Sequence, residues 1–360
     1  MAEDNLSIAI KKRPYETIMR WAESRLHLMG ARTFKYLALQ PPSLIIPTIP
    51  YSNGSFPTKI NVLILSPSGS GKTTLSEMLE KISYDPISYE RITQAGLEKE
   101  ITGRTRFSLI IGDVERLFKD INTIKLLEGL IGEEQKMSYL TAVKSAQEKI
   151  NGVFTGFGLP SSLTKYASYG LIQRMSTIII YHTPEERKEI AKSIADGIGH
   201  TKPDTETENI KNYYKELLKI QWGEGPIEKV SGYIIEPKTT TEIYQKWEKL
   251  IEELEFPEGK YLQRELQLAF KYMVSHSFLN IFNRKIEENK LIVSREDINL
   301  SLGLMEHEMR LKQKVLHTIA EMSGKDGREL QLYRSMAHDE KLSFFHRNII
   351  KSVLGGNGDS

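Results

Sequence analysis

Residues 61–74 contain the side chains and backbone of this chain that are best suited to bind a polyphosphate. Its four apolar residues 62–65 predict a buried strand, and residues 75–82, which follow the segment, favour a helix. Between them, Gly69 and Gly71 allow the backbone N–H groups to fold around phosphate oxygens at the positive end of that helix. The residues expected to form this nucleotide-binding loop are Ser66, Pro67, Ser68, Gly69, Ser70, Gly71, Lys72, Thr73 and Thr74.

Two side chains of the loop have expected chemical roles. The Lys72 ammonium is expected to contact the β- and γ-phosphates, and the Thr73 hydroxyl is expected to bind Mg²⁺. The first position of the loop is Ser66, where glycine is usual. The alternative is a Ser/Gly turn that only joins a buried strand to a helix. The order of strand, loop and helix favours ATP and Mg²⁺ as ligands.

A second apolar run, residues 107–111, is followed by acidic residues. Asp113 comes just after this predicted strand, where a carboxylate can hold Mg²⁺ through water. Glu115 is close enough in sequence to polarise an attacking water. The alternative is a buried strand followed by a charged helix cap. Together with the loop, the pattern predicts that Asp113 and Glu115 are catalytic.

Two further residues are candidates for sensing or stabilising the γ-phosphate. Thr155 ends a short predicted strand and could orient the water. Arg174 precedes a fully apolar strand, at the edge of the core domain, where it is useless to its own site. We expect it to stabilise transition-state charge at the nucleotide of a neighbouring subunit. The alternative is an ordinary surface arginine.

Four basic residues are candidates for contacts outside the core. Lys144 lies at the tip of a hairpin predicted over 137–157 and could contact a DNA phosphate, or could simply be solvated. Arg264, in the first turn of a long predicted helix, could contact the nucleotide from a lid. Arg347 and Lys351 would face outward on a C-terminal helix-turn-helix that could bind DNA. Small helical tails without DNA-binding activity have the same pattern.

The composition restricts the class of protein. The chain has 360 residues, a formal net charge of +2 and no cysteine. Disulfides, zinc ribbons and thiol nucleophiles are therefore excluded, and the net charge gives no general attraction to nucleic acid. No apolar run approaches the roughly 20 residues that a membrane helix needs, and the first residues do not resemble a signal peptide. We expect a cytoplasmic protein with no membrane partner.

Apolar periodicity predicts the elements that position these residues. It indicates an amphipathic helix over 14–29, and the Pro-rich passage 40–58 is expected to wrap the rim of the core because proline disfavours central strands. Other helices are expected over 92–101, 121–131, 209–221, 239–255, 261–284 and 294–310. The expected divisions are an N-terminal helix and wrap (1–58), a nucleotide-binding core (59–199), a helical linker and lid (200–310) and a winged-helix tail (311–360).

The order of these parts resembles the AAA+ ATPases, and within them the core of the MCM replicative helicases. The matching segments span roughly residues 59–310. They are the loop 66–73, the helix 92–101 before the Asp113 strand, the hairpin region 132–157, Leu171-Ile-Gln-Arg174, the segment 183–187, and the helical end from Arg264 to Asp297.

The resemblance implies an α/β fold, with a P-loop core of five parallel strands, an all-helical lid and a C-terminal winged helix. It implies that Asp113 is the second Mg²⁺ partner, that Arg174 is an arginine finger acting on the neighbouring subunit, and that Arg264 is a sensor on the lid. The Lys144 hairpin would grip DNA. The implied assembly is a ring, usually hexameric.

Several features depart from the family pattern. Asp113 and Glu115 are separated by one residue, where the family usually has adjacent Asp-Glu. The sensor asparagine is missing, and Thr155 is its substitute candidate. The insertion in helix two is absent or very short, and we expect no zinc-containing N-terminal domain before the core. We therefore expect a minimal relative, of the kind found on viruses and plasmids.

The expected function is a ring-forming ATP-dependent DNA motor, a helicase or translocase in replication. One alternative is a DNA-bound AAA+ initiator, loader or regulator that uses ATP only to assemble. The spacing of Asp113 and Glu115 favours this alternative. Another is a nucleoside or nucleotide kinase, since the strand, loop and helix also suit that class. A lone arginine before a fifth strand and a helical lid favour the motor over the kinase.

Overall fold

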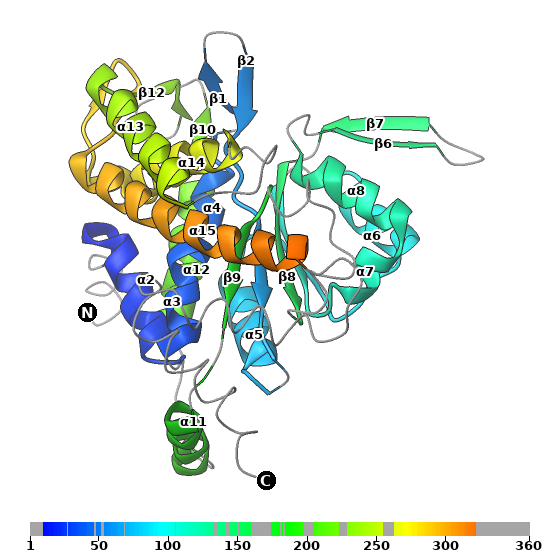
Figure 1. Cartoon of the computed structure of the whole chain (residues 1–360). Helices are drawn as coiled ribbons and strands as arrows, with labels where there is room; N and C mark the ends of the chain where they lie inside the picture. The colour runs from blue at the N-terminus through cyan, green and yellow to red at the C-terminus, as the bar shows by residue number, and fades with distance from the viewer. Residues whose placement is uncertain are drawn as a thin grey trace.

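A sheet of five parallel strands forms the centre of the protein (Figure 1). The computed structural model describes residues 10–321 except 27, 47, 52–53, 68, 105, 133–135, 141–144, 150, 160–173, 181, 183, 198–204, 223–228 and 255–262. In spatial order the strands are β4 (Pro86–Tyr89), β5 (Arg106–Ile111), β8 (Asn151–Gly158), β3 (Val62–Leu65) and β9 (Ser176–Ile179). The α/β class and the five parallel strands expected from the sequence are confirmed.

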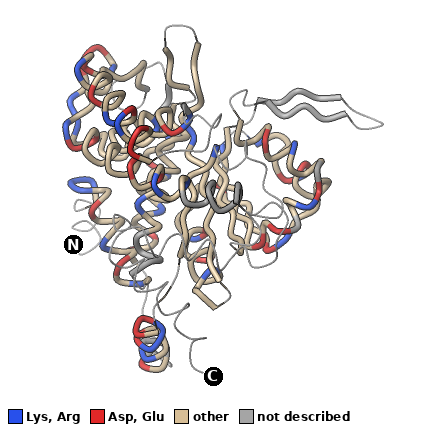
Figure 2. Tube along the Cα trace, in the orientation of Figure 1, with Lys and Arg blue, Asp and Glu red and all other residues tan. Residues whose placement is uncertain are grey.

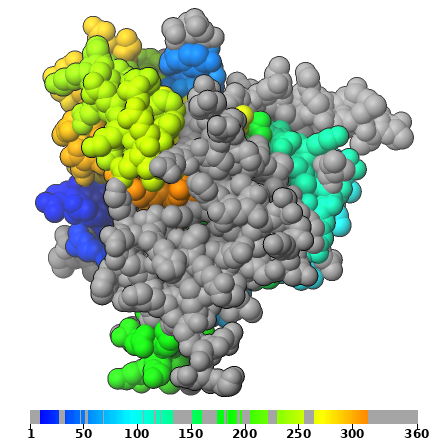
Figure 3. All heavy atoms as spheres, in the orientation of Figure 1, coloured from blue at the N-terminus to red at the C-terminus, as the bar shows by residue number. Residues whose placement is uncertain are grey.

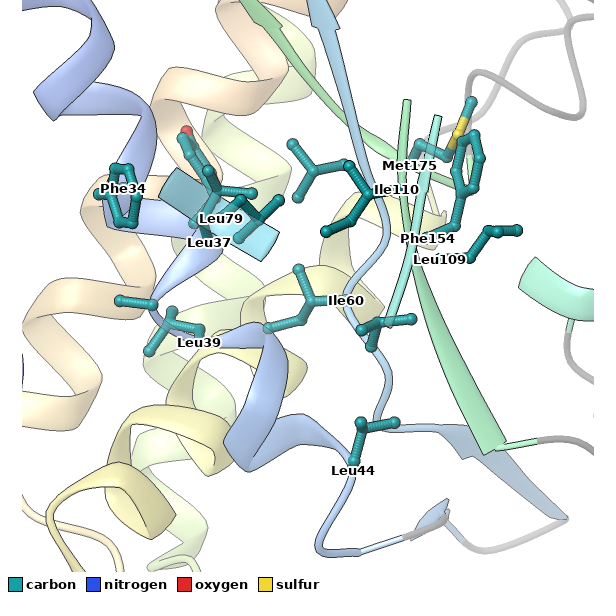
Figure 4. Close-up of a cluster of buried hydrophobic side chains, with 14 of the residues drawn as sticks. Phe34, Leu37, Leu39, Leu44, Ile60, Leu79, Leu109, Ile110, Phe154 and Met175 are labelled. Atoms are coloured by element: carbon teal, nitrogen blue, oxygen red, sulfur yellow. The ribbon is translucent and has the colours of Figure 1, made fainter. Parts of the chain in front are cut away.

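The central strands are apolar because helices cover both faces of the sheet. Every residue of β3 and β9 is buried, as is usual for strands of a parallel sheet. Helices α5 (Lys72–Ile82) and α12 (Thr205–Leu218) pack against each other, and α8 (Ile121–Ile131) packs against β8. Figure 4 shows part of the resulting core, in which Ile110 lies on the side of the sheet that faces Leu79 and Leu37, while Leu109, Phe154 and Met175 lie together on the other side.

The strand order places a crevice at the carboxyl end of β3. The chain goes from β3 to the far strand β4, returns through β5 and β8, and then adds β9 on the other side of β3. The connection that leaves β3 and the one that leaves its neighbour β8 therefore run in opposite directions, and ligands of open parallel sheets bind at such a point. The loop 66–71 lies at this position. We call this end of the sheet the carboxyl edge and the opposite end the amino edge.

The N-terminal part folds into two helices where one was predicted. Helix α2 (Pro14–Glu23) ends near Ser24, and α3 (Leu28–Leu37) begins four residues later, so a single helix over 14–29 is wrong. The break lets α3 turn back, and Phe34 then packs edge-on against Trp21 with ring centroids 5.4 Å apart. The Pro-rich passage forms α4 (Gln40–Ser43) and an antiparallel hairpin of β1 (Thr48–Tyr51) and β2 (Gly54–Pro57), outside the central sheet as predicted.

The segment between the first strands and β8 agrees with the sequence except in the hairpin. Helix α6 (Gln94–Ile101) is capped by Thr93, and α7 (Glu115–Lys119) precedes α8, whose bounds are those predicted. The hairpin consists of β6 (Lys136–Leu140) and β7 (Ser145–Lys149). Residues 151–158, predicted in part as its second arm, form the central strand β8, because their apolar side chains are buried between β5 and β3.

The C-terminal half is mainly but not entirely helical. After α11 (Pro184–Gly197), helices α13 (Pro237–Leu254), α14 (Gln263–Leu279) and α15 (Arg295–Glu321) share a second hydrophobic cluster. The small sheet of β12 (Gly232–Ile234), β14 (Lys290–Ile292) and β13 (Ile286–Glu287) contradicts the expectation of an all-helical lid. The remaining short elements are β10 (Gln221–Trp222), β11 (Lys229–Val230) and the 3₁₀ helix η1 (Ile281–Asn283).

Helix α15 differs from its prediction at one end only. Ser294 caps it as expected, with Asp297 accepting hydrogen bonds from the Ser294 backbone and hydroxyl at 2.8 Å each. The helix continues to Glu321, so residues 312–321 belong to α15. The rest of the expected winged helix, residues 322–360, lies outside the described residues.

Charged residues lie mainly on the outer helices. Figure 2 shows both signs mixed along α11 and α13, and few charges on the central strands. In the space-filling view, α13 and the β1–β2 hairpin lie beside each other at one end of the visible face and α11 at the other (Figure 3). Among the helices that the structure describes, none has the length and apolar character required to cross a membrane.

Candidate functional site

The loop between β3 and α5 has the backbone geometry of an anion-binding turn. Gly69 and Gly71 have φ values of 76° and 85°, in the left-handed region that other residues rarely adopt. Gly71 is the N-cap of α5, and no side chain caps this helix end. The first N–H groups of α5 are therefore available to a ligand, and its first turn has no acidic residue to repel an anion.

Two side-chain observations support a phosphate ligand at this loop. Lys72 lies across the loop, with its Nζ 3.0 Å from the Ser66 carbonyl oxygen and 3.3 Å from that of Pro67. The Ser66 hydroxyl is buried and makes no hydrogen bond to any described residue. A buried hydroxyl without a partner costs free energy unless a ligand or water supplies one. The loop therefore fits a phosphate group, while Ser68 lies outside the described residues.

Asp113 lies at the carboxyl edge, as predicted, two strands away from β3. The ladders place it level with Gly158 and Leu65, roughly 10 Å from the start of the loop. Its Oδ1 accepts from the Glu115 backbone N–H at 3.0 Å, and its Oδ2 lies 3.2 Å from Arg91 Nε. Asp113 could therefore contact a Mg²⁺ ion through water, beside a positively charged neighbour that the sequence did not indicate.

Glu115 has a different environment from the one expected of a general base. It is the first residue of α7, and its Oε1 accepts a hydrogen bond from Lys119 at 2.8 Å, one turn later. Another carboxylate, that of Glu90 just after β4, lies over Gly112, where an added Cβ would come within 2.1 Å of Glu90 Oε2. The structure does not direct Glu115 toward the loop.

Thr155 is not brought to the nucleotide loop. It pairs with Val62, three residues before β3 ends, and its side chain is buried. Its hydroxyl donates to Gln40 Oε1 at 3.0 Å, and Gln40 also bonds the Ile60 and Phe154 carbonyls. The role predicted for Thr155 beside the γ-phosphate is therefore wrong: this hydroxyl belongs to a buried polar network that fastens α4 to the sheet.

Arg174 and Arg264 lie together at the amino edge. Both line a small cleft with Lys271 of α14 and with Ile131 at the end of α8. Arg174 precedes β9 by two residues and lies 4.0 Å from Glu128. The length of the sheet, on the order of 15–20 Å, separates these arginines from the loop of the same chain. Contact of Arg264 with its own nucleotide is thus not seen.

A buried lysine completes this group, which we call the amino-edge cluster: Lys59, Arg174, Arg264 and Lys271. Lys59 is 1% exposed, precedes β3, and donates a hydrogen bond to the Leu130 carbonyl at the end of α8. Burial, and secondarily the charge of Lys271, lowers the pKa of Lys59 to about 7.

Next to the cluster, a buried charged triad joins α14 and α15 to the edge strand. Lys312 Nζ lies 2.9 Å from Glu265 and 3.1 Å from Glu308, and all three side chains are fully buried. Glu308 accepts from the Thr177 backbone N–H of β9 at 3.0 Å. Burial raises the pKa of Glu308 to about 6, against the opposing effect of Lys312. The triad satisfies a backbone donor on the free edge of the sheet.

A cavity of about 710 Å³ lies on the outer side of β9. Ile178 and Ile179 of β9 line it together with residues of α2, α3 and α15. Its polar lining includes Tyr36 and His307, whose hydroxyl and Nδ1 share a 2.7 Å hydrogen bond. Ile179 pairs with Leu65, so the cavity begins one strand spacing from the nucleotide loop.

The remaining predicted site residues lie outside the part of the chain that the structure describes: Lys144, Arg347 and Lys351. Thr73 and Thr74 are exposed in the first turn of α5. Within the described ranges no three His, Asp or Glu side chains form a group suited to a metal ion. A Mg²⁺ ion at this site would therefore depend on phosphate oxygens as well as on Thr73 and Asp113.

The arrangement is compatible with the core of a P-loop nucleotide-binding protein. No protein-family model and no curated protein matches the chain. Sequence reasoning missed Arg91 and also His182, which contacts the loop from the segment after β9. The only signal for His182 was its place two residues after the apolar run 178–180.

Proposed function

We propose that this protein is an ATPase that assembles head to tail, so that two chains share each nucleotide. One observation carries the proposal: Lys72 and Arg174 lie at opposite edges of the same sheet. Arg174 is too far from its own loop, but it could contact a γ-phosphate held by a neighbour. Because the two contacting surfaces differ, the assembly would close into a ring or continue as a filament, and we favour the ring.

The residues of one loop would bind the triphosphate. Its N–H groups would donate to phosphate oxygens, and Lys72 would leave the Ser66 and Pro67 carbonyls to neutralise the β- and γ-phosphates. Thr73 and Asp113 would hold Mg²⁺, which supplies charge neutralisation between the phosphates. Arg174 of the adjacent copy would add positive charge as the γ-phosphate is transferred to water.

The position of Asp113 predicts how the nucleotide lies. Its carboxylate is on the β8 and β5 side of the loop, so the γ-phosphate end would point that way. The nucleoside would then leave toward β9, where the 710 Å³ cavity offers apolar walls and the Tyr36–His307 pair. A cavity of this size accommodates a base and ribose.

Action on DNA, as a helicase or translocase, is the finer part of the proposal. It depends on the resemblance to MCM-type ATPases, with DNA contacted by the Lys144 hairpin. ATP hydrolysis measured with and without single- and double-stranded DNA, alongside the mass of the assembly, tests it. Stimulation by DNA in an assembled form would support a motor.

A second candidate, an ATP-dependent switch with little hydrolysis, has its own supporting observation. Asp113 is engaged by Arg91, and Glu115 by Lys119. If these ion pairs persist with nucleotide bound, no carboxylate would polarise the attacking water. Negligible turnover with ATP-dependent assembly would select this function.

Mixing two inactive variants tests the shared site most directly. Lys72→Ala should lose nucleotide binding, and Arg174→Ala should bind ATP without hydrolysing it. In a mixture, some interfaces combine an intact loop from the Arg174→Ala chain with an intact arginine from the Lys72→Ala chain. ATPase activity should therefore reappear on mixing.

A matched control is Arg295→Ala, which removes an exposed arginine of α15 that pairs with Glu242 of α13. This variant should hydrolyse ATP at the wild-type rate. Absence of activity in every mixture, or equal rates for Arg174→Ala and wild type in the assembled form, would refute the shared site.

A further inference from the structure

His182 is buried directly against the nucleotide-binding loop. It follows β9 and precedes α11, and its side chain is 6% exposed. Its Nε2 lies 3.0 Å from the carbonyl oxygen of Ser70. Because a carbonyl oxygen only accepts, Nε2 carries the proton and donates it to Ser70.

This contact determines which way one peptide of the loop faces. The Ser70 carbonyl and the Gly71 N–H belong to the same peptide, and all described peptide bonds are trans. In a trans peptide the C=O and N–H groups point in opposite directions. With the carbonyl held by His182, the Gly71 N–H is directed away from His182.

One hydrogen bond within the loop holds the same arrangement, and a carboxylate lies near the other side of the imidazole. The Ser70 hydroxyl donates to the Pro67 carbonyl at 2.7 Å, which fixes Ser70 from within the loop. On the far side of the imidazole, Glu186 Oε2 lies 3.8 Å from His182 Nδ1 and is equally buried. Glu186 belongs to the first turn of α11, so this pair connects that helix to the loop.

We propose that His182 is a positioning residue of the nucleotide site, which orients the Ser70–Gly71 peptide so that the Gly71 N–H donates to a phosphate. The inference rests on the proposed binding of ATP. His182 acts through the backbone of the loop and does not touch the nucleotide. Its removal should therefore weaken binding of ATP and ADP and leave the turnover number of assembled protein nearly unchanged.

Two amide variants separate positioning from packing. In His182→Gln the side-chain NH₂ occupies nearly the place of imidazole Nε2 and can donate to Ser70, whereas in His182→Asn it is one methylene too short. We expect Kd for ATP to rise roughly threefold to tenfold in the Asn variant, the loss of one hydrogen bond, and to stay within about twofold of wild type in the Gln variant. Isothermal titration with ATP measures both.

Each outcome of this comparison has a consequence. Equal weakening in both variants would show a packing role, and unchanged affinity in both would show no role, so either result overturns the inference. If wild type binds ATP and these variants also bind normally, only the role of His182 fails. If wild type binds no ATP, the proposed function fails with it.

A measurement on the unmodified protein covers the case in which a variant does not fold. ¹⁵N NMR of histidine-labelled wild-type protein should find a proton on Nε2 of His182, with and without ADP. An unprotonated Nε2 cannot donate to Ser70 and would overturn the inference.

Discussion

The carboxyl and amino edges of the central sheet are built in different ways. At the carboxyl edge, one continuous segment, residues 66–74, supplies most of the candidate site, largely through backbone groups. At the amino edge, long side chains from three separated parts of the chain form the cluster. Lys59 comes from the segment before β3, Arg174 from the segment before β9, and the other two residues from α14.

This difference indicates how each edge depends on the rest of the fold. The loop is formed by β3, α5 and the local turn between them, and His182 from the segment after β9 contacts it. The amino edge needs α14 to pack against β9. The hydroxyls of Tyr272 and Ser176, which lie 2.5 Å apart, stabilise this packing. The triad of Glu265, Lys312 and Glu308 also stabilises it. Substitutions at the amino edge should therefore change stability or assembly, and those at the carboxyl edge should change nucleotide affinity.

The largest expected effect is on stability, from Lys312→Met. This change leaves two buried carboxylates without their cation, which typically costs about 3–5 kcal/mol. Denaturant unfolding should show that loss, and the folded fraction should bind ATP as wild type does. The triple variant Lys312→Met, Glu265→Gln, Glu308→Gln is the control and should recover most of the loss. A loss below about 1 kcal/mol in Lys312→Met would contradict the importance of the triad.

A pair of lysine substitutions compares the two edges directly. Lys72→Met should weaken ATP binding at least 100-fold, about 2.7 kcal/mol, because it removes the cation at the phosphates. Lys271→Met is the matching substitution in the amino-edge cluster. In unassembled protein it should leave the affinity for ATP within about threefold of the wild-type value. Fluorescent-nucleotide titration at low protein concentration measures both. Similar losses in the two variants would mean that both edges contact the same nucleotide within one chain.

The sequence predicted the carboxyl edge well because its signals are local. Gly69, Gly71 and Lys72 form one short motif, and Asp113 follows a strand that ends in the apolar run 109–111. Thr155 was misplaced because an apolar run shows that a strand exists but not where its ladder ends. The partner that holds Thr155 is Gln40, 115 residues away, and no local pattern indicates it.

The amino edge could be predicted only in part. Arg174 was recognised by its place before an apolar strand, but its neighbour Arg264 is 90 residues later in the chain. Their meeting depends on the packing of α14, which periodicity does not specify. The small sheet of β12, β13 and β14 was missed because strands of two or three residues carry no measurable alternation.

The third prediction concerns pH and the triad. Because burial raises the pKa of Glu308 to about 6 from an ordinary 4.5, the folded state binds this proton more tightly than the unfolded state. The contribution of Glu308 to stability should therefore fall as pH rises from about 4.5 to 6, by about 2 kcal/mol. The difference in unfolding free energy between wild type and Glu308→Gln should change by that amount between pH 4.5 and 7.

Glu306→Gln provides a control of opposite sign. Burial acts to raise the pKa of Glu306, but hydrogen bonds from Lys246 and Arg310 prevail and lower it. Its contribution is therefore present at neutral pH and is lost as pH falls below the ordinary value for a glutamate. If the difference in unfolding free energy between wild type and Glu308→Gln does not depend on pH, then burial does not raise the pKa of the Glu308 carboxyl.

The smallest expected effect comes from a matched pair of glycines, one at each edge. Gly71 and Gly103 have φ values of 85° and 79°, and an added Cβ would meet no atom within 4 Å at either position. Gly71→Ala and Gly103→Ala should therefore cost the same backbone strain, about 1 kcal/mol, in thermal unfolding. Only Gly71→Ala should also weaken ATP binding, because Gly103 lies in the turn before β5 at the amino edge. Equal ATP affinities in the two variants would mean that the loop conformation is irrelevant to the ligand, and the contrast between the edges would be lost.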